Sequence, residues 1–284
     1  MPQQMRPYRS VLYIPGSKPR ALDKARTLAT DAIIFDLEDA VSPDAKSEAR
    51  ATLRAELDKG GYGNRAKLVR VNGFDTAWGA EDIAAFKGAD IDGILLPKVN
   101  SADDVETLAG SIPDVALWAM METPRAMLNA AEIAAHPRLA GMVMGTNDLA
   151  KDMGCRFRAD RLALITSLQL CLLAARAEEV TIVDGVYNAF KDDDGLRAEC
   201  EQGRDMGFDG KTLIHPAQLA IANECFAPSA EELELARRQI AAFEDVEASG
   251  QGVAVVDGKI VENLHIVTAR ALLEKAAAIH ALED

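Results

Sequence analysis

Short apolar runs rich in Val, Ile and Leu alternate with segments of helical periodicity eight times along the chain. The apolar runs occupy residues 10–15, 31–39, 67–72, 93–98, 116–123, 141–149, 181–186 and 209–215. Residues 19–29 and 103–110 are typical of the segments between them, in which apolar positions recur every three to four residues. Strands that alternate with helices in this way predict βαβ units and a parallel sheet.

Two architectures fit eight such units, a closed (β/α)₈ barrel (TIM barrel) and an open, doubly wound sheet. The 284-residue length is close to the ~250 residues typical of a single α/β barrel. No Gly-rich dinucleotide-binding turn follows an early strand, and the sequence lacks a P-loop. We therefore favour the barrel.

About 65 residues follow the eighth strand and cannot belong to the eightfold pattern. They predict a helix over 228–249, a β-hairpin around Asp257-Gly258 and a final helix over 263–282. We expect a barrel domain over residues 1–225. A helical and hairpin extension over 226–284 is expected to act as a lid and an oligomer contact.

Composition narrows the possible partners and the compartment. The net charge of −14 argues against nucleic acid, which requires a basic face. It leaves room for an anionic ligand on the local basic patch of Lys18, Arg20, Lys24 and Arg26. The four cysteines show no paired or metal-type spacing. We find no apolar run long enough to predict a membrane span, and the N-terminus does not resemble a signal peptide. We expect a cytoplasmic protein with reduced thiols.

Polar side chains stand where the predicted strands end. They are Asp36, Glu38, Asp39, Arg70, Asn72, Lys98, Glu122, Asn147, Asp148, Asp184, Lys211 and His215. The active sites of barrels of this type lie at these strand ends. Glu122 and Asp148 each follow an apolar strand, and two neighbouring buried carboxylates require a proton or a cation between them. Mg²⁺ suits such a pair, although each residue could instead cap the helix that follows.

Arg70 lies on an otherwise apolar strand, where a buried guanidinium needs an anionic partner. That partner could be a substrate carboxylate or thioester oxygen, or a structural ion pair with Asp36 or Glu38. Asp36 and Glu38 share one strand face and could act as bases or orient metal-bound water, whereas Asp39 fits a helix cap equally well. For His215, a structural hydrogen bond is at least as plausible as catalysis.

Seven stretches between residues 9 and 223 occur in an order that resembles the citrate lyase β-subunit-like proteins of the HpcH/HpaI aldolase group, which include malyl-CoA and citramalyl-CoA lyases. The matching stretches are RSVLYIPGSKPRALDKA, IIFDLEDAVSPDAKSEAR, VRVNGFDT, GILLPKV, ETPRAMLNA, GTNDLAKDMG and GKTLIHPAQL. The resemblance implies a TIM barrel that binds Mg²⁺, or Mn²⁺, and a coenzyme A thioester.

The resemblance also assigns candidate roles to individual residues. Glu122 and Asp148 match the metal ligands, and Arg70 matches a substrate-binding arginine. Asn147 stands beside Asp148 in the same motif and is taken as a substrate contact. Four residues match regions near the coenzyme A: Lys18, Arg20, Ile214 and His215.

The acidic residues Glu38 and Asp39 match side chains that line the metal site. In the tail, the family's lid carries an aspartate that reaches the active site of a neighbouring subunit. Glu262 stands in that position here, and we expect its extra methylene to move the carboxylate by about an ångström, which is enough to alter catalysis. A lid that acts between subunits implies a homo-oligomer, and we expect a trimer or hexamer.

These features predict a Mg²⁺-dependent carbon–carbon lyase. Its substrate would be a 3-hydroxyacyl-CoA such as malyl-CoA or citramalyl-CoA, cleaved to glyoxylate or pyruvate and an acyl-CoA, or formed by the reverse condensation. The competing functions are a malyl-CoA thioesterase that releases malate and free CoA, and a citryl thioester lyase similar to the citrate lyase β-subunit. A class II aldolase acting without CoA, and a non-catalytic scaffold, also fit parts of the pattern.

Overall fold

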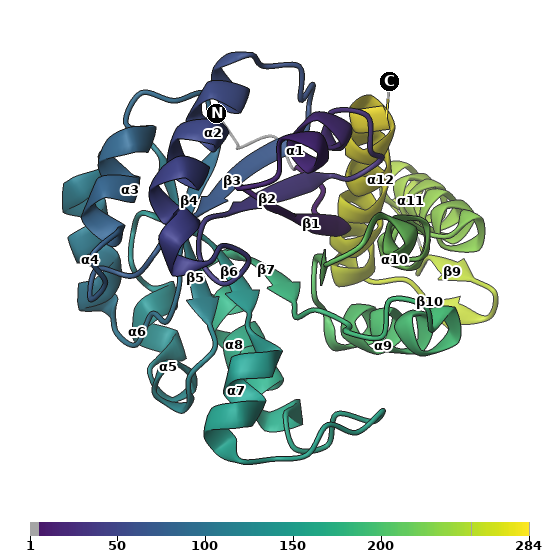
Figure 1. Cartoon of the computed structure of the whole chain (residues 1–284). Helices are drawn as coiled ribbons and strands as arrows, with labels where there is room; N and C mark the ends of the chain where they lie inside the picture. The colour runs from purple at the N-terminus through teal and green to yellow at the C-terminus, as the bar shows by residue number, and fades with distance from the viewer. Residues whose placement is uncertain (1–5, 251, 284) are drawn as a thin grey trace. The chain divides into compact units, whose positions relative to one another are not determined.

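Eight parallel strands close into one barrel in chain order, and the eighth strand pairs with the first. The computed structural model describes residues 6–250 and 252–283. The strands, drawn as arrows in Figure 1, are β1 (Ser10–Pro15), β2 (Ala32–Asp36), β3 (Ala66–Arg70), β4 (Gly93–Leu96), β5 (Ala116–Met121), β6 (Leu139–Met144), β7 (Thr181–Asp184) and β8 (Gly210–Leu213). The predicted TIM barrel is confirmed, and the doubly wound alternative is excluded because β1 and β8 are hydrogen-bonded.

Helices follow the strands around the outside of the barrel (Figure 1). They are α1 (Pro19–Ala25), η1 (Pro43–Ala45), α2 (Lys46–Asp58), α3 (Gly79–Phe86), α4 (Ala102–Ser111), α5 (Pro124–Leu128), α6 (Ala130–Ala134), α7 (Thr146–Met153), α8 (Ile165–Ala177), α9 (Asp193–Met206), η2 (Pro216–Gln218) and α10 (Leu219–Phe226). Local sequence sets several of their ends. A capping box of Ser101 and Asp104 starts α4, and Gly207 ends α9 in the left-handed conformation.

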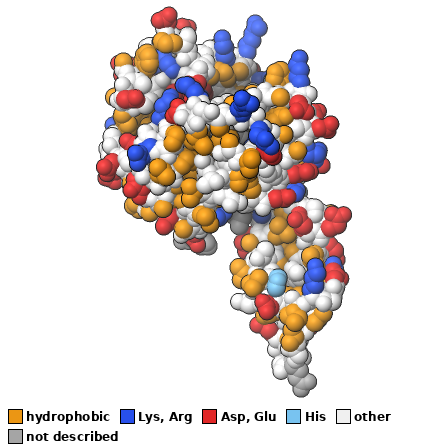
Figure 2. Space-filling view, turned by 90° about the horizontal axis from the view of Figure 1, so that it is seen from below, with side chains coloured by type: hydrophobic (Ala, Val, Ile, Leu, Met, Phe, Trp, Pro, Cys, Tyr) orange, Lys and Arg blue, Asp and Glu red, His pale blue; other side chains and the backbone are white. Residues whose placement is uncertain are grey.

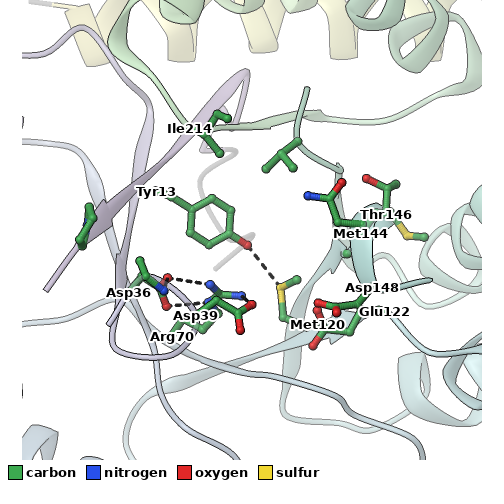
Figure 3. Close-up of a pocket in the computed structure, with 15 residues that line it drawn as sticks. Tyr13, Asp36, Asp39, Arg70, Met120, Glu122, Met144, Thr146, Asp148 and Ile214 are labelled. Atoms are coloured by element: carbon green, nitrogen blue, oxygen red, sulfur yellow. Dashed lines mark hydrogen bonds and ion pairs between the residues drawn. The ribbon is translucent and has the colours of Figure 1, made fainter. Parts of the chain in front are cut away.

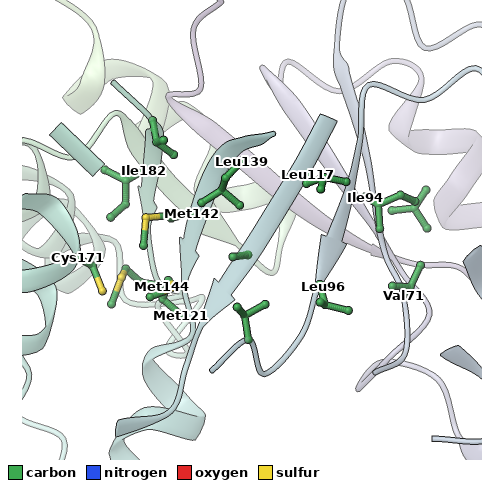
Figure 4. Packing of buried hydrophobic residues seen from close by; sticks show 14 of the residues in the cluster. Val71, Ile94, Leu96, Leu117, Met121, Leu139, Met142, Met144, Cys171 and Ile182 are labelled. Carbon is green, nitrogen blue, oxygen red and sulfur yellow. The ribbon is translucent and has the colours of Figure 1, made fainter. Parts of the chain in front are cut away.

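The two-residue repeat of the strands divides the apolar side chains into two cores. One set fills the barrel interior, as Val11, Ile34, Leu68 and Met120 do. Their chain neighbours, such as Leu12, face outward and pack between the sheet and the helices, where Figure 4 shows Met121, Met142 and Ile182. A polar residue near a strand end therefore faces the barrel interior or the helices according to its position in this alternation.

The predicted sixth strand is too long. β6 ends at Met144, and the residues that follow form α7, which begins at Thr146. Gly145 is the N-cap and ends the strand, and Asn147 and Asp148 fall in the first helical turn. An acidic side chain in this turn is favoured by the positive end of the helix dipole. Asp148 is thus presented by a helix start and not by a strand.

The chain from Ala227 onward forms a second compact unit. It contains α11 (Ala230–Ser249), β9 (Val255–Val256), β10 (Lys259–Ile260) and α12 (Asn263–Glu283). The predicted hairpin is present, because β9 and β10 pair antiparallel and both turn residues, Asp257 and Gly258, have positive φ. The proposed role of this unit as a lid and oligomer contact stays a prediction.

Acidic and basic side chains are interspersed with apolar ones over the face of the molecule drawn in Figure 2. Within residues 6–250 and 252–283, none of the helices has both the length and the apolar character that crossing a bilayer requires.

A substitution at Gly210 tests whether β1 and β8 close the barrel. A Cβ at this position would collide with the backbone carbonyl of Tyr8, and pairing between β1 and β8 prevents the backbone from moving away. We expect Gly210→Ala to destabilise the protein by about 1–3 kcal/mol and to lower Tm by several degrees. Gly110 in α4 is the matched control. A Cβ added there would meet no other atom within 4 Å, so Gly110→Ala should leave Tm unchanged or raise it. Equal melting temperatures for the two variants, measured by calorimetry, would contradict this description of the closure.

Candidate active site

Four inward-facing side chains meet at the carboxyl end of the barrel because they share one phase of the strand repeat. Asp36 and Arg70 each stand two residues after an interior apolar residue, and they are paired in register across β2 and β3. Tyr13 and Glu122 occupy equivalent positions on β1 and just beyond β5. These side chains border a cavity of about 360 Å³, shown in Figure 3. Its walls also include Asp39, Met120, Met144, Thr146, Asn147, Asp148, Val186 and Ile214.

Arg70 is held by carboxylates on three of its nitrogens. Nε and Nη2 donate to the two oxygens of Asp36, at 2.7 and 2.6 Å, in a bidentate pair that is almost fully buried. Nη1 lies 3.0 Å from Glu38 Oε2 and 3.4 Å from Asp39 Oδ2. Burial lowers the pKa of Arg70, but the charge of Asp36 raises it well above its usual value. The ion pair with Asp36 and Glu38, one of the two possibilities for Arg70, is therefore present, and Arg70 also borders the cavity.

Asp36, Glu38 and Asp39 have different roles around this guanidinium. Asp36 also accepts the backbone N–H groups of Glu38 and Ala40, which fixes the loop after β2. Glu38 is buried and bridges Arg70 to Lys98, whose Nζ lies 2.8 Å from Glu38 Oε1. The Asp39 side chain is 60% exposed and makes the longest of these contacts with Arg70. Asp39 is therefore the cavity carboxylate that can most easily exchange a protein partner for a ligand.

Glu122 is buried, and it does not cap the helix after it. Thr123 is the N-cap of α5 and accepts the N–H of Ala126. Glu122 Oε1 instead accepts the backbone N–H of Lys98 at 2.7 Å. Lys98 has a φ of 52°, which is an unusual value for a residue other than glycine. This backbone conformation directs its N–H toward Glu122. Burial raises the pKa of Glu122 to about 7, although the Lys98 N–H and the charge of Arg70 lower it.

Glu122 and Asp148 lie side by side at one end of the cavity in Figure 3, and the charge of Asp148 contributes to the raised pKa of Glu122. Among the described residues no group of three or more His, Cys, Asp or Glu could enclose a metal ion. Glu122 and Asp148 would therefore supply two carboxylates to a metal ion and leave its other positions to water and substrate, which is the arrangement that Mg²⁺ prefers. A cation between them would also offset the cost of burying Glu122 as an anion. The residues present fit the predicted metal.

The other predicted contacts are distributed around this cavity. Asn147 borders it, and its side-chain amide exchanges hydrogen bonds with that of Asn188. Ile214 is in the wall, and the neighbouring His215 accepts the N–H of Ala217 through Nδ1 and starts η2. The structural hydrogen bond that we considered for His215 is thus present.

The remaining predicted site residues lie outside the cavity wall. Lys18 and Arg20 are exposed at the start of α1, outside the set of described residues that border the cavity. Glu262 belongs to the second unit, where its carbonyl accepts the N–H of His265 in front of α12. The proposed coenzyme A contacts of Lys18, Arg20, Ile214 and His215, and the catalytic part of Glu262, stay predictions.

Asp184 and Lys211 are strand-end residues that face away from the cavity. They follow the outward phase of their strands, opposite to Val183, and both are completely buried. Lys211 Nζ contacts Asp184 at 3.2 Å and Glu199 of α9 at 2.6 Å, and Arg161 completes the cluster through Asp184. These charges join the sheet to its outer helix layer. The expectation that all the strand-end polar groups meet at the rim was therefore wrong for this pair.

Tyr13 and Met120 are among the cavity residues that were not predicted as sites from the sequence. Tyr13 belongs to an apolar run, and Met120 is typical of barrel packing. The two-residue alternation was a usable signal, because it places Tyr13 two residues after Val11, on the interior side of β1. The positive φ of Lys98, by contrast, has no signature in the sequence.

A cavity with converging charged groups at this end of a βα barrel is the arrangement found in TIM-barrel enzymes. The chain belongs to the HpcH/HpaI aldolase/citrate lyase family, whose model matches residues 9–216. It is 72% identical to a (3S)-malyl-CoA thioesterase from Cereibacter sphaeroides, over 99% of both chains. An L-malyl-CoA/β-methylmalyl-CoA lyase from the same species is 32% identical, over 99% of this chain and 98% of the lyase.

A solved structure has the same fold. Protein CitE from Mycobacterium tuberculosis, crystallised with magnesium, acetoacetate and coenzyme A, superposes with a TM-score of 0.81 and is 33% identical. The match covers 96% of this chain and all of that one. The family and the fold that the sequence motifs indicated are both confirmed.

The carbon–carbon lyase prediction is corrected by these comparisons. The identity to the thioesterase, 72%, is more than twice the 32% identity to the lyase, and both matches span nearly the whole chain. The motifs behind the prediction mark carboxylates and a guanidinium that can activate a thioester for either reaction. They carry no information on whether a C–C or a C–S bond breaks.

Metal binding tests the pairing of Glu122 with Asp148. We expect the Glu122→Gln and Asp148→Asn variants each to bind Mg²⁺ at least about tenfold more weakly, because even outer-shell changes around a metal have effects of this size. Titration calorimetry on the purified protein measures this directly. Glu106→Gln, which changes an exposed carboxylate on α4 that contacts His136, should bind Mg²⁺ as the parent does. Unchanged affinity in both site variants would exclude the proposed site.

Proposed function

We propose that this protein is a Mg²⁺-dependent thioesterase that hydrolyses malyl-CoA, or a close 3-hydroxyacyl relative, to the free acid and coenzyme A. The 72% identity to a (3S)-malyl-CoA thioesterase over 99% of the chain is the observation that carries this proposal. The cavity supports it, since carboxylates and one guanidinium surround a space of about 360 Å³ that is open to a small acyl group.

The two halves of the cavity would bind different parts of the malyl group. Glu122 and Asp148 would hold the cation, which when bound polarises substrate oxygens and draws negative charge toward that end. Arg70 lies at the opposite end. Its Nη1 is paired with Glu38 at 3.0 Å, and it contacts Asp39, the carboxylate that borders the cavity, at 3.4 Å. A substrate carboxylate can replace that contact with a shorter, charge-assisted hydrogen bond while Asp36 keeps the guanidinium in place.

Hydrolysis requires a group that removes a proton from water, and Asp39 is our candidate. Its side chain borders the cavity and is 60% exposed, so water can reach it. The water oxygen bonds to the acyl carbon, and the proton that it loses passes to Asp39. The carbon–sulfur bond breaks, and the coenzyme A sulfur takes that proton. The products are a carboxylic acid and a free thiol, with no oxidant or further reactant.

Products identify the reaction. We expect the purified protein to release free thiol from malyl-CoA in the presence of Mg²⁺, without accumulating glyoxylate or another 2-oxo acid. Removal of the metal with a chelator should abolish release, because the site is then two repelling carboxylates. A thiol reagent and a 2-oxo acid assay, run in parallel on a panel of CoA thioesters, provide the measurement. Formation of 2-oxo acid and acyl-CoA at the rate of substrate loss would refute the thioesterase assignment.

The base has its own test. Asp39→Asn keeps the size of the side chain but removes its basicity, so kcat for thiol release should fall about 10²–10⁴-fold. Asp44→Asn is the matched control, because Asp44 is an exposed residue of η1 outside the cavity wall. It should leave kcat unchanged. If Asp39→Asn hydrolyses malyl-CoA as fast as the parent, another group removes the proton.

A further inference from the structure

Tyr13 is an inward-facing residue of β1 that lies between the two charged ends of the cavity (Figure 3). The Arg70 guanidinium lies 5.0 Å from the centre of its ring on one side. On the other side its hydroxyl points to Met120, beyond which Glu122 and Asp148 stand. The hydroxyl is therefore next to the space between the proposed carboxylate anchor and the proposed cation.

The hydrogen-bonding capacity of this hydroxyl is largely unused. It contacts the sulfur of Met120 at 3.4 Å. A thioether is a weak acceptor, whereas a tyrosine hydroxyl that is shielded from bulk water ordinarily bonds to an oxygen or nitrogen. A ligand oxygen in the cavity would be a better partner than the sulfur.

Two other side-chain donors in the wall, those of Arg70 and Asn147, already have partners in the protein. Arg70 donates to Asp36, Glu38 and Asp39. The amide of Asn147 is engaged with that of Asn188. The Tyr13 hydroxyl can turn toward a ligand by giving up only the sulfur contact, so it loses less than either of these groups would.

The phenol is suited to donate a proton in a hydrogen bond and not to act as a base. Burial raises the pKa of Tyr13 well above its usual value; Arg70 lowers it, and the carboxylates of Asp36 and Glu122 raise it further. Tyr13 therefore stays protonated throughout the physiological range. A neutral donor also adds no charge that Arg70 would repel.

We propose that the Tyr13 hydroxyl donates a hydrogen bond to the acyl oxygen of the bound thioester and stabilises the negative charge that develops there as water attacks. This role rests on the proposed thioesterase function for its catalytic effect. The hydrogen bond itself requires only that a CoA thioester binds in the cavity. A donor that is fixed in place before the reaction stabilises such an oxyanion without reorganisation during the step.

Tyr13→Phe removes the hydroxyl and keeps the ring under Arg70. We expect kcat for thiol release from malyl-CoA to fall about 10²-fold, with a smaller change in KM, as for other oxyanion donors. Tyr62→Phe is a matched control. Tyr62 also lies beneath an arginine, with Arg26 4.6 Å from its ring centre, but its hydroxyl donates to the carbonyl of Leu22, away from the cavity. This control should keep the parent kcat.

A second readout does not depend on turnover. The infrared stretch of a ¹³C-labelled thioester carbonyl, recorded in the first milliseconds after malyl-CoA binds, should lie at lower frequency in the parent than in Tyr13→Phe. Replacing Tyr13 with 3,5-difluorotyrosine keeps its shape and strengthens the donor, so it should lower the frequency further. This variant also serves if the phenylalanine variant does not fold.

The outcomes separate the two proposals. If the parent protein releases no thiol, the thioesterase function is wrong, and the carbonyl frequency alone decides whether Tyr13 contacts the acyl oxygen. If the parent is active and Tyr13→Phe matches it in both kcat and carbonyl frequency, the role of Tyr13 is refuted. A lower kcat with an unchanged carbonyl frequency also refutes it, because the hydroxyl would then act elsewhere.

Discussion

The imbalance of charge at the barrel mouth is the constraint on which the site depends. Four carboxylates, those of Asp36, Asp39, Glu122 and Asp148, border one cavity that contains a single guanidinium. Asp36 neutralises Arg70 through a bidentate pair, and among the described residues no second guanidinium borders the cavity to pair with the other acids in the same way. Burial disfavours the anionic form of Glu122 and raises its pKa to about 7. A divalent cation between Glu122 and Asp148 would relieve this repulsion, and it would also supply the electrophile that thioester chemistry needs.

The fold produces this imbalance through ordinary strand geometry. Along each strand, every second side chain faces the barrel interior. The interior side chains are apolar within the strands and polar two residues further on, at the mouth of the barrel. The opposite phase puts Asp184 and Lys211 between the sheet and α9, where their opposite charges pair. The same backbone pattern therefore places an excess of negative charge at the cavity inside the barrel and a set of paired charges between the sheet and its outer helices.

Much of the fold and part of the candidate site could be predicted from the sequence. Regular alternation of apolar runs with helices indicated the eight strands, and Asp257-Gly258 indicated the hairpin, because both signals are local. The start of α7 at Thr146 was missed, since an apolar run followed by polar residues does not show where a strand becomes a helix. Predicting that Tyr13 faces the cavity required knowing which residues of β1 point inward. The positive φ of Lys98 could be found only from the three-dimensional structure. The reaction outcome was mistaken because lyase and thioesterase need the same activating groups, and the motifs report only those.

We propose that one cation lies between Glu122 and Asp148, opposite Arg70. A crystal grown with Mn²⁺ and malate tests it most directly, because anomalous scattering locates the metal independently of any assignment of water. We predict a single anomalous peak in contact with a carboxylate oxygen of each residue, with malate between it and Arg70. Glu122 and Asp148 turned away from each other around solvent, or a manganese peak bound elsewhere, would contradict the account.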